Sequence, residues 1–242
     1  MKYSLDVVDW RALAPGINDA SQWVTWAANN TSLPVSDELA KSQRIPMMTA
    51  RRMSPASRLA VEASLDIMDR HSVDMAIFTS RHGELERTYK IVQSLAKDHE
   101  TSPTDFSMSV HNTAAGWMTI AGKKIFPVTS LAAGEDSFQQ GFLEAFALLN
   151  TGIQHVLLVD FDGAVPSVYK QNVPSLYAPY ATAFLLAKGS MMNCERVSGK
   201  DIQTAAILPQ SLQFLRGWLN AEHSFPVAAK THLWQWATQR DK

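Results

Sequence analysis

The stretch from Ile125 to Phe161 constrains the fold most, because it predicts a strand, a sharp turn, a helix and a second strand in direct succession. Ile125–Leu131 mixes β-branched and apolar residues and suits a buried strand. The residues after it are small, as a tight turn requires, and they are Ala132, Ala133 and Gly134. His155–Phe161 is again an apolar strand. A right-handed crossover with parallel pairing is therefore expected.

The segment between the two strands predicts an amphipathic helix. Asp136 or Ser137 can cap its first turn. Apolar residues recur at helical spacing and form one face, namely Phe138, Phe142, Ala145, Phe146 and Leu149. Asn150–Gly152 ends the helix, because Asn and Gly accept the left-handed conformation found after a helix C-terminus.

The rest of the chain alternates between strand and helix patterns. Further strands are expected at Tyr3–Val8, Met75–Thr79 and Tyr180–Lys188. Further helices are expected at Ser21–Asn29, Ser54–Arg70, Leu85–Ala96, His111–Ala121 and Pro209–Ala221. Turns or loops are expected at Trp10–Pro15, Ser80–Glu84, Asn30–Thr49, Pro166–Pro179 and Gly189–Lys200. Asp201–Ile207 fits a strand or a helix start, and Thr231–Arg240 is amphipathic. This order predicts an α/β fold with a mostly parallel or mixed central sheet covered by helices, in one domain over residues 1–242.

Charge and cysteine content exclude several classes of protein. The net charge of −1 gives no electrostatic basis for binding nucleic acid or an anionic membrane. Cys194 is the only cysteine, so no internal disulfide can form and a reducing compartment is expected. The first ten residues lack the apolar core of a signal peptide, and no apolar run approaches the roughly 20 residues of a membrane span. We expect a cytoplasmic protein.

The turn after Ile125–Leu131 is a strand-to-helix elbow, where enzymes place a Ser or Cys nucleophile. This chain places Glu135 there. A simpler interpretation is that Glu135 only stabilises the N-terminus of the following helix, an effect of about 0.3–1 kcal/mol. Ser137 lies in a Gly-Glu-Asp-Ser-Phe context without the G-x-S-x-G pattern, which argues against a serine hydrolase.

The sequence predicts no metal site and no cofactor. The seven histidines are scattered without metal-ligand spacing. Asp160 and Asp162 hint at a cation loop, but only two carboxylates are present, and a turn at a strand end explains them better. There is no G-x-G-x-x-G and no phosphate loop. His82 and His111 border the elbow and are candidates to line a pocket.

The run from His111 to Val159 resembles the N-terminal half of β-ketoacyl-acyl carrier protein synthases. The family's N-M-A-A-G helix is matched by Asn112, Ala114, Ala115 and Gly116. Pro127 matches the family's proline, and Thr151-Gly152 stands where the family has Ser-Gly, so that the family's nucleophilic Cys falls on Glu135 without a gap. The segments SRHGELERTYKIVQSL, FSMSVHNTAAG and LAAGEDSF look closer still to the short, stand-alone ketosynthase-like chain length factors of aryl polyene clusters.

The resemblance covers about residues 54–161 and implies a thiolase-like half domain, with residues 162–242 as an elaborated C-terminal segment. It also implies no catalysis by this chain, because Glu135 cannot carry a thioester and the synthases' two histidine motifs do not occur. The residues implied to line an acyl tunnel are Ser80, Arg81, His82, Gly83, His111, Asn112, Glu135 and Phe138.

The resemblance further implies a heterodimer with a ketosynthase subunit, because the family's dimers pair the strand before the elbow across a two-fold axis. The implied contact residues are Lys124, Ile125, Phe126, Val128, Thr129 and Ser130. The expected function is a non-catalytic chain length factor in a type II polyketide or fatty acid system making aryl polyenes, where tunnel depth limits the acyl chain. An acyl carrier protein is a further candidate partner. The alternatives are a decarboxylase that primes chains, with Glu135 in place of the Cys, and a homodimeric scaffold.

Overall fold

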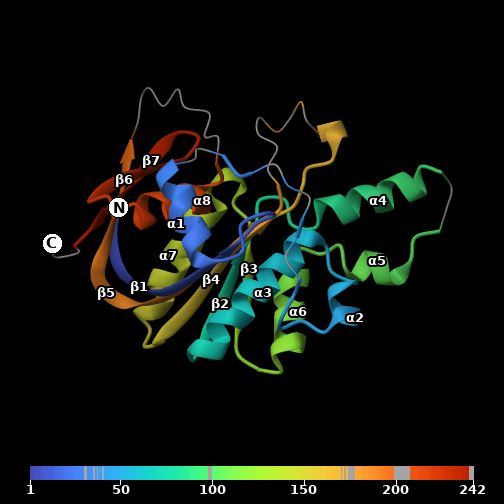
Figure 1. Cartoon of the computed structure of the whole chain (residues 1–242), viewed down its shortest axis with the longest axis horizontal. Helices are drawn as coiled ribbons and strands as arrows, with labels where there is room; N and C mark the ends of the chain where they lie inside the picture. The colour runs from blue at the N-terminus through green and yellow to red at the C-terminus, as the bar shows by residue number, and fades with distance from the viewer. Residues whose placement is uncertain are drawn as a thin grey trace.

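The computed structural model describes residues 1–29, 32–34, 36, 38, 39, 41–97, 100–169, 171, 173, 178–198 and 208–239 (Figure 1). The strands are β1 (Lys2–Leu13), β2 (Met75–Thr79), β3 (Val128–Leu131), β4 (His155–Asp162), β5 (Tyr180–Ser198), β6 (Ser224–Ala228) and β7 (His232–Thr238). The α-helices are α1 (Ala20–Asn29), α2 (Met47–Ala50), α3 (Pro55–Arg70), α4 (Leu85–Leu95), α5 (Pro103–Ser107), α6 (Thr113–Gly122), α7 (Ser137–Leu149) and α8 (Gln210–Leu219). Two short 3₁₀ turns are η1 (Gly134–Asp136) and η2 (Ser167–Tyr169).

The strands form one mixed sheet in the order β3-β2-β4-β5-β7-β6, with β1 paired to β5. β2 pairs in parallel with both β3 and β4, whereas the other pairings are antiparallel. The predicted α/β class is confirmed, and its parallel part is confined to β3, β2 and β4. The crossover from β3 through α7 to β4 joins parallel strands as predicted, with β2 lying between them.

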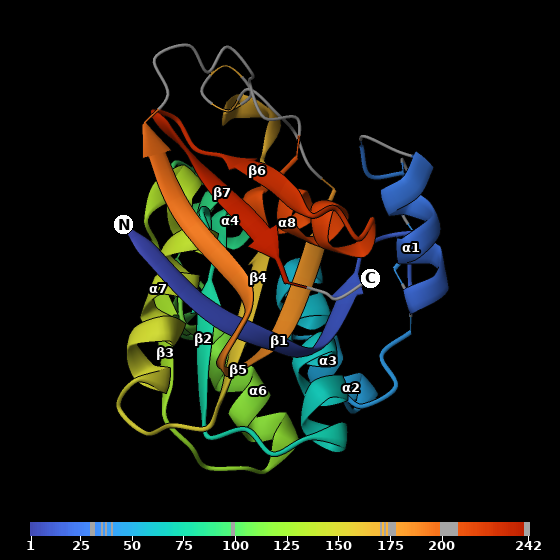
Figure 2. The same cartoon turned by 90° about the vertical axis from the view of Figure 1, so that its left-hand side faces the viewer.

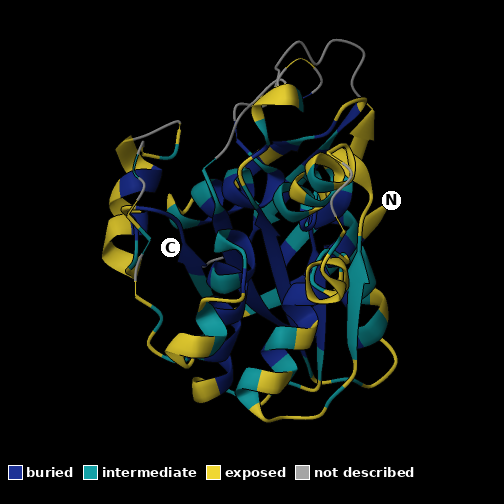
Figure 3. Cartoon of the chain, turned by 90° about the vertical axis from the view of Figure 1, so that its right-hand side faces the viewer, coloured by how far each residue is buried: buried dark blue, intermediate teal, exposed yellow. Residues whose placement is uncertain are grey.

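The sheet is covered on both faces, and β4 shows how its residues divide. Val156 and Leu158 point into a core shared with α7, α8 and β7, whereas Leu157 and Val159 point into a core shared with α3 and α6. In Figure 3 the strands at the centre are accordingly dark blue, and the exposed residues lie on the outer helices and loops. No helix in the described part of the chain is both long enough and apolar enough to cross a membrane.

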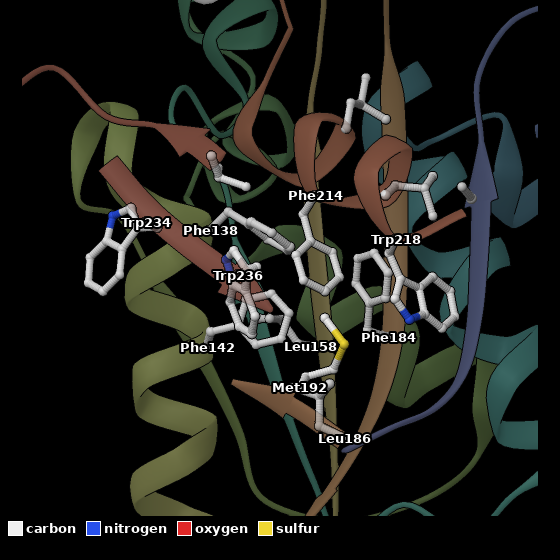
Figure 4. Close-up of a cluster of buried hydrophobic side chains, with 14 of the residues drawn as sticks. Phe138, Phe142, Leu158, Phe184, Leu186, Met192, Phe214, Trp218, Trp234 and Trp236 are labelled. Atoms are coloured by element: carbon white, nitrogen blue, oxygen red, sulfur yellow. The ribbon is translucent and has the colours of Figure 1, made fainter. Parts of the chain in front are cut away.

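An aromatic cluster fixes α7 in this arrangement. Phe142 on α7 has ring centroids 4.9 Å from Phe214 of α8 and 4.7 Å from Trp236 of β7. Phe138 packs against Phe184 of β5 and against Phe214 (Figure 4). The helix that starts at the elbow is therefore held by the sheet and by the C-terminal elements together.

The helix after Ser54 forms as predicted. Ser54 Oγ accepts a hydrogen bond from the Ser57 amide, and Pro55 occupies the first helical position. The predicted narrow polar side is confirmed, because most residues of α3 are buried. α1 also matches its prediction, with Trp23 and Trp26 both buried.

Several predicted boundaries were wrong because pairing overrides local turn signals. β1 continues through Trp10 to Leu13 against β5, where a turn was expected. β5 continues past Lys188 to Ser198, because its second half pairs with β7. The predicted turn at Gly189 is a bulge around Asp6, whose carboxylate accepts from the Met191 amide at 2.8 Å.

Three short elements also departed from expectation. β6 and α5 were not predicted, and α2 overlaps the end of the expected loop at 30–49. The strand before the elbow begins at Val128, and Ile125 is fully exposed outside it. The segment 201–207, whose structure the sequence left open, lies outside the described residues.

Candidate functional site

The elbow between β3 and α7 is a tight, exposed turn. Gly134 has φ +64°, a conformation that side chains rarely adopt, and Ala132, Ala133 and Gly134 are all exposed. Ser137 Oγ accepts from the Ala133 amide at 2.9 Å and donates to the Gly134 carbonyl at 2.8 Å. The turn is thus held by a side chain of the first helical turn.

Asp136 does not cap α7 with its side chain, which corrects one of the two predicted caps. Its Oδ1 instead accepts from Trp234 Nε1 at 2.8 Å and from Gln210 Nε2 at 2.9 Å. These bonds tie the start of α7 to β7 and α8. The carboxylate that sequence reasoning assigned to local capping therefore binds the C-terminal elements to the elbow.

Glu135, at the tip of the elbow, forms an ion pair with Arg81. Arg81 Nη2 lies 3.2 Å from Glu135 Oε1, with the two side chains 27% and 40% exposed. The structure therefore brings together two of the predicted tunnel residues, one from the loop after β2 and one from the elbow after β3. At the residue that the sequence resemblance aligns with the family's nucleophilic Cys, this chain carries a carboxylate paired with a guanidinium.

The loop after β2 is held by Asp162, the last residue of β4. Its buried carboxylate accepts from Ser80 Oγ at 2.6 Å, from the Arg81 amide at 3.1 Å and from the His82 amide at 2.9 Å. Burial raises the pKa of Asp162, and these hydrogen bonds oppose that shift. Three predicted tunnel residues, Ser80 to His82, are thus fixed by a carboxylate that the sequence suggested only as part of a turn.

The other predicted tunnel residues divide between this loop and the core. His111 Nε2 lies 3.1 Å from the Ser80 carbonyl, and its ring packs against Gly83, which has φ +54°. Asn112 precedes α6 and is exposed, without a side-chain capping bond. Phe138 lies in the aromatic cluster. The structure gathers the loop residues, His111 and Glu135, and places Asn112 and Phe138 outside this group of contacts.

His82 faces a small cavity. The cavity has a volume of about 10 Å³ and is lined by His82, Glu84, Ala56 and Gly163, among others. Burial, and then the charge of Arg81, lower the pKa of His82. The imidazole is therefore biased toward its neutral form beside this cavity.

A second buried carboxyl, Asp160, lies two residues before Asp162 on β4. It accepts from Thr79 Oγ1 at 2.7 Å, Tyr180 Oη at 3.0 Å and Ser211 Oγ at 2.6 Å. Burial and the neighbouring Asp162 raise the pKa of Asp160 to about 7. Sequence reasoning missed this role, because the three hydroxyls come from β2, β5 and α8 and meet only in the folded chain.

The predicted contact strand lies at an edge of the sheet. β3 pairs with β2 on one side, and among the described strands it ends the sheet order. Its residues are partly exposed, as is Phe126, and Lys124 Nζ donates to the Met68 carbonyl at 3.0 Å. Within the described residues, no group of His, Cys, Asp and Glu is arranged to hold a metal ion.

The parallel β3-β2-β4 unit, the elbow and the crossover helix define a thiolase-like ketosynthase fold. Residues 23–237 match the family described as beta-ketoacyl synthase, N-terminal domain, and the chain belongs to this family. It is 44% identical, with a TM-score of 0.92, to a chain from the complex of a ketosynthase with its chain length factor from Xenorhabdus doucetiae. That match covers 97% of this chain and 99% of the other. The predicted family is confirmed.

More distant structures share the fold alone. The ishigamide ketosynthase/chain length factor matches with a TM-score of 0.75 at 12% identity, covering 98% of this chain and 99% of that one. A beta-ketoacyl synthase from Burkholderia phymatum STM815 matches with a TM-score of 0.61 at 12% identity, over 92% of this chain and 71% of the other. No match was found among curated protein sequences.

Proposed function

We propose that this chain is the non-catalytic chain length factor of a heterodimer with a ketosynthase, in a system that makes aryl polyenes. The observation that carries the proposal is Glu135, paired with Arg81 at the tip of the elbow. A condensing enzyme needs a thiolate there to hold the acyl chain, and a carboxylate bound to a guanidinium does not provide that nucleophile.

The relatives support the assembly. The Xenorhabdus doucetiae structure holds a ketosynthase together with its chain length factor, and the matched chain has nearly the same span as this one. The assignment to aryl polyenes is supported by the sequence segments around Ser80, His111 and Glu135 that resemble this class.

The proposed mechanism is steric. Asp162 holds the loop Ser80–Gly83 in place, and His111 packs on the same loop. A fixed loop next to the partner's acyl chain forms a wall, and an acyl chain too long for the space cannot bury its last carbons. The open edge of β3 is the proposed site where the ketosynthase adds its own strand.

Co-expression with a candidate partner ketosynthase tests the proposal. A tag on this chain should recover the ketosynthase in equal amount, and native mass spectrometry should show one copy of each. Recovery of a homodimer alone would favour the scaffold alternative. Release of CO₂ from a malonyl carrier protein by the isolated chain would favour the decarboxylase alternative, and either result contradicts the proposed function.

A further inference from the structure

The Arg81–Glu135 ion pair differs from an ordinary surface pair because both backbones are fixed. Asp162 binds the amide of Arg81 and that of His82, and Ser137 binds the elbow on both sides of Gly134. Most exposed ion pairs contribute little, because ordering two long side chains offsets their attraction. Here a buried carboxylate and a hydroxyl hold the chain on each side of the pair.

The pair also lies close to the C-terminal end of β3, the strand at the edge of the sheet. Ala132 follows Leu131, the last residue of β3, and the exposed turn Ala132–Gly134 leads directly to Glu135. A subunit that adds a strand to β3 therefore comes close to the elbow. A carboxylate buried there without a counter-charge would strongly oppose association.

We propose that Arg81 and Glu135 form a preassembled, neutral contact that the ketosynthase subunit buries on assembly. Arg81 supplies the counter-charge that lowers the cost of burying the Glu135 carboxylate in the interface. This inference rests on the proposed function, since it takes the ketosynthase as the occupant of the β3 edge. Glu135 is then both the residue at the tip of the elbow and part of the surface that contacts the ketosynthase.

A double-mutant cycle on complex formation tests the inference. The variants are Arg81→Met, Glu135→Gln and the two combined, each measured for its dissociation constant with the ketosynthase. Arg81→Met keeps the backbone bond to Asp162, because the donor is the main-chain amide. Its methionine leaves Glu135 charged and unpaired, so it should weaken binding about tenfold or more relative to the double variant.

The Lys2–Glu195 pair provides the matched control. It joins side chains that are 73% and 47% exposed, on β1 and β5. In the same cycle with Lys2→Met and Glu195→Gln, the coupling between the two substitutions should change the dissociation constant by less than about twofold. Coupling of less than about fivefold at Arg81 and Glu135, in a complex that otherwise forms normally, overturns the inference.

Thiol labelling gives an independent measurement. The native Cys194 is buried, so Glu135→Cys adds the reactive thiol that N-ethylmaleimide reports. Labelling should be about tenfold slower in the complex than in the isolated subunit, since the interface excludes the reagent. Val24→Cys is the control, because Val24 is 48% exposed on α1, and Figure 2 shows α1 and β3 on opposite sides of the molecule.

The outcomes separate the two proposals. Equal labelling of Glu135→Cys with and without a bound ketosynthase overturns this inference and leaves the proposed function standing. If the wild-type chain does not bind the ketosynthase at all, the proposed function fails and the inference fails with it.

Discussion

Asp160 makes the stability of the chain depend on pH in an unusual direction. Its carboxyl has a pKa of about 7 in the folded chain, above the ordinary value of an aspartate. Between about pH 4 and pH 7 the folded state therefore holds a proton that the unfolded state has lost, and the contribution of Asp160 to stability falls as pH rises through this window.

Asp160→Asn should remove this dependence. The groups that face the site are the Thr79, Tyr180 and Ser211 hydroxyls and the Asp162 carboxylate, and all of them remain in the variant. The melting temperature of the variant relative to wild type should rise from pH 5 to about pH 7 and level off above it, because only in the wild type does the unfolded state lose a proton that the folded state keeps. Parallel melting curves for the two proteins across this range would contradict the assignment.

His82 is the residue we expect to influence product length. Its structural bond to Asp162 uses the main-chain amide, so changing the side chain leaves that bond in place. His82→Ala should shift carrier-bound products of the reconstituted pair to longer chains, and His82→Trp to shorter ones. Discrimination per methylene is only about 1–3 kcal/mol, so mass spectrometry should show a shifted distribution. An unchanged distribution of product lengths in both variants, with the complex intact, would show that His82 does not line the tunnel.

At the residue level, the sequence identified Glu135 as the exceptional elbow residue but not its partner. Arg81 and Glu135 are 54 positions apart and meet only because β2 and β3 are neighbours in the sheet. Asp162 and Asp160 were visible only as carboxylates near a strand end. Their hydrogen-bond donors come from other elements, so local pattern alone cannot assign their roles.

At the level of elements, the two edges of β3 differ. The carbonyl of Pro127 accepts from the Ala76 amide of β2, and that of Leu131 accepts from the amide of Ser80, the residue after β2. The odd-numbered residues of this strand therefore direct their backbone groups to β2. The backbone groups of Ser130 therefore point to the open edge. Ser130→Pro removes an outward N–H and is compatible with an edge strand. The subunit should therefore fold but fail to bind the ketosynthase. Ser130→Ala keeps the N–H and should bind normally, and a Pro variant that still co-purifies would place the interface elsewhere.

The close packing of α8 on β6 leaves no room for a side chain at Gly217. A Cβ on Gly217 would lie 2.3 Å from Phe225 Cγ, inside a buried contact. Gly217→Ala should lower the free energy of unfolding by about 1–3 kcal/mol in urea titrations. Gly116 on α6 has no atom within 4 Å of the same position, so Gly116→Ala should instead raise stability by about 0.5–1 kcal/mol. Equal effects of the two substitutions would contradict the described packing.

The sequence predicted elements best where a helix cap or a strong hydrophobic periodicity was present. Ser54 and Pro55 marked the start of α3, and Gly152 marked the end of α7. The errors fell where long-range pairing decides the outcome. Gly189 looks like a turn, yet β5 runs through it, because β1 and β7 provide partners on either side of the bulge.

For the whole molecule, the C-terminal elements complete the core around the elbow helix. α8 and β7 supply Phe214 and Trp236 to the cluster around Phe142 (Figure 4). Asp136 binds these same elements at the start of α7. The sequence suggested amphipathic segments here, but it did not show that they pack on α7, since that contact joins regions far apart in the chain.

The central claim is that this chain shapes the acyl space without taking part in the chemistry. The most direct test is mass spectrometry of carrier-bound products from the ketosynthase paired with the Arg81→Met/Glu135→Gln double variant, at concentrations that saturate the complex. The account predicts elongated products, because neither residue contacts the reacting atoms, whereas replacing the nucleophilic cysteine of the ketosynthase should abolish them. An intact complex with the double variant that forms no product would contradict the account.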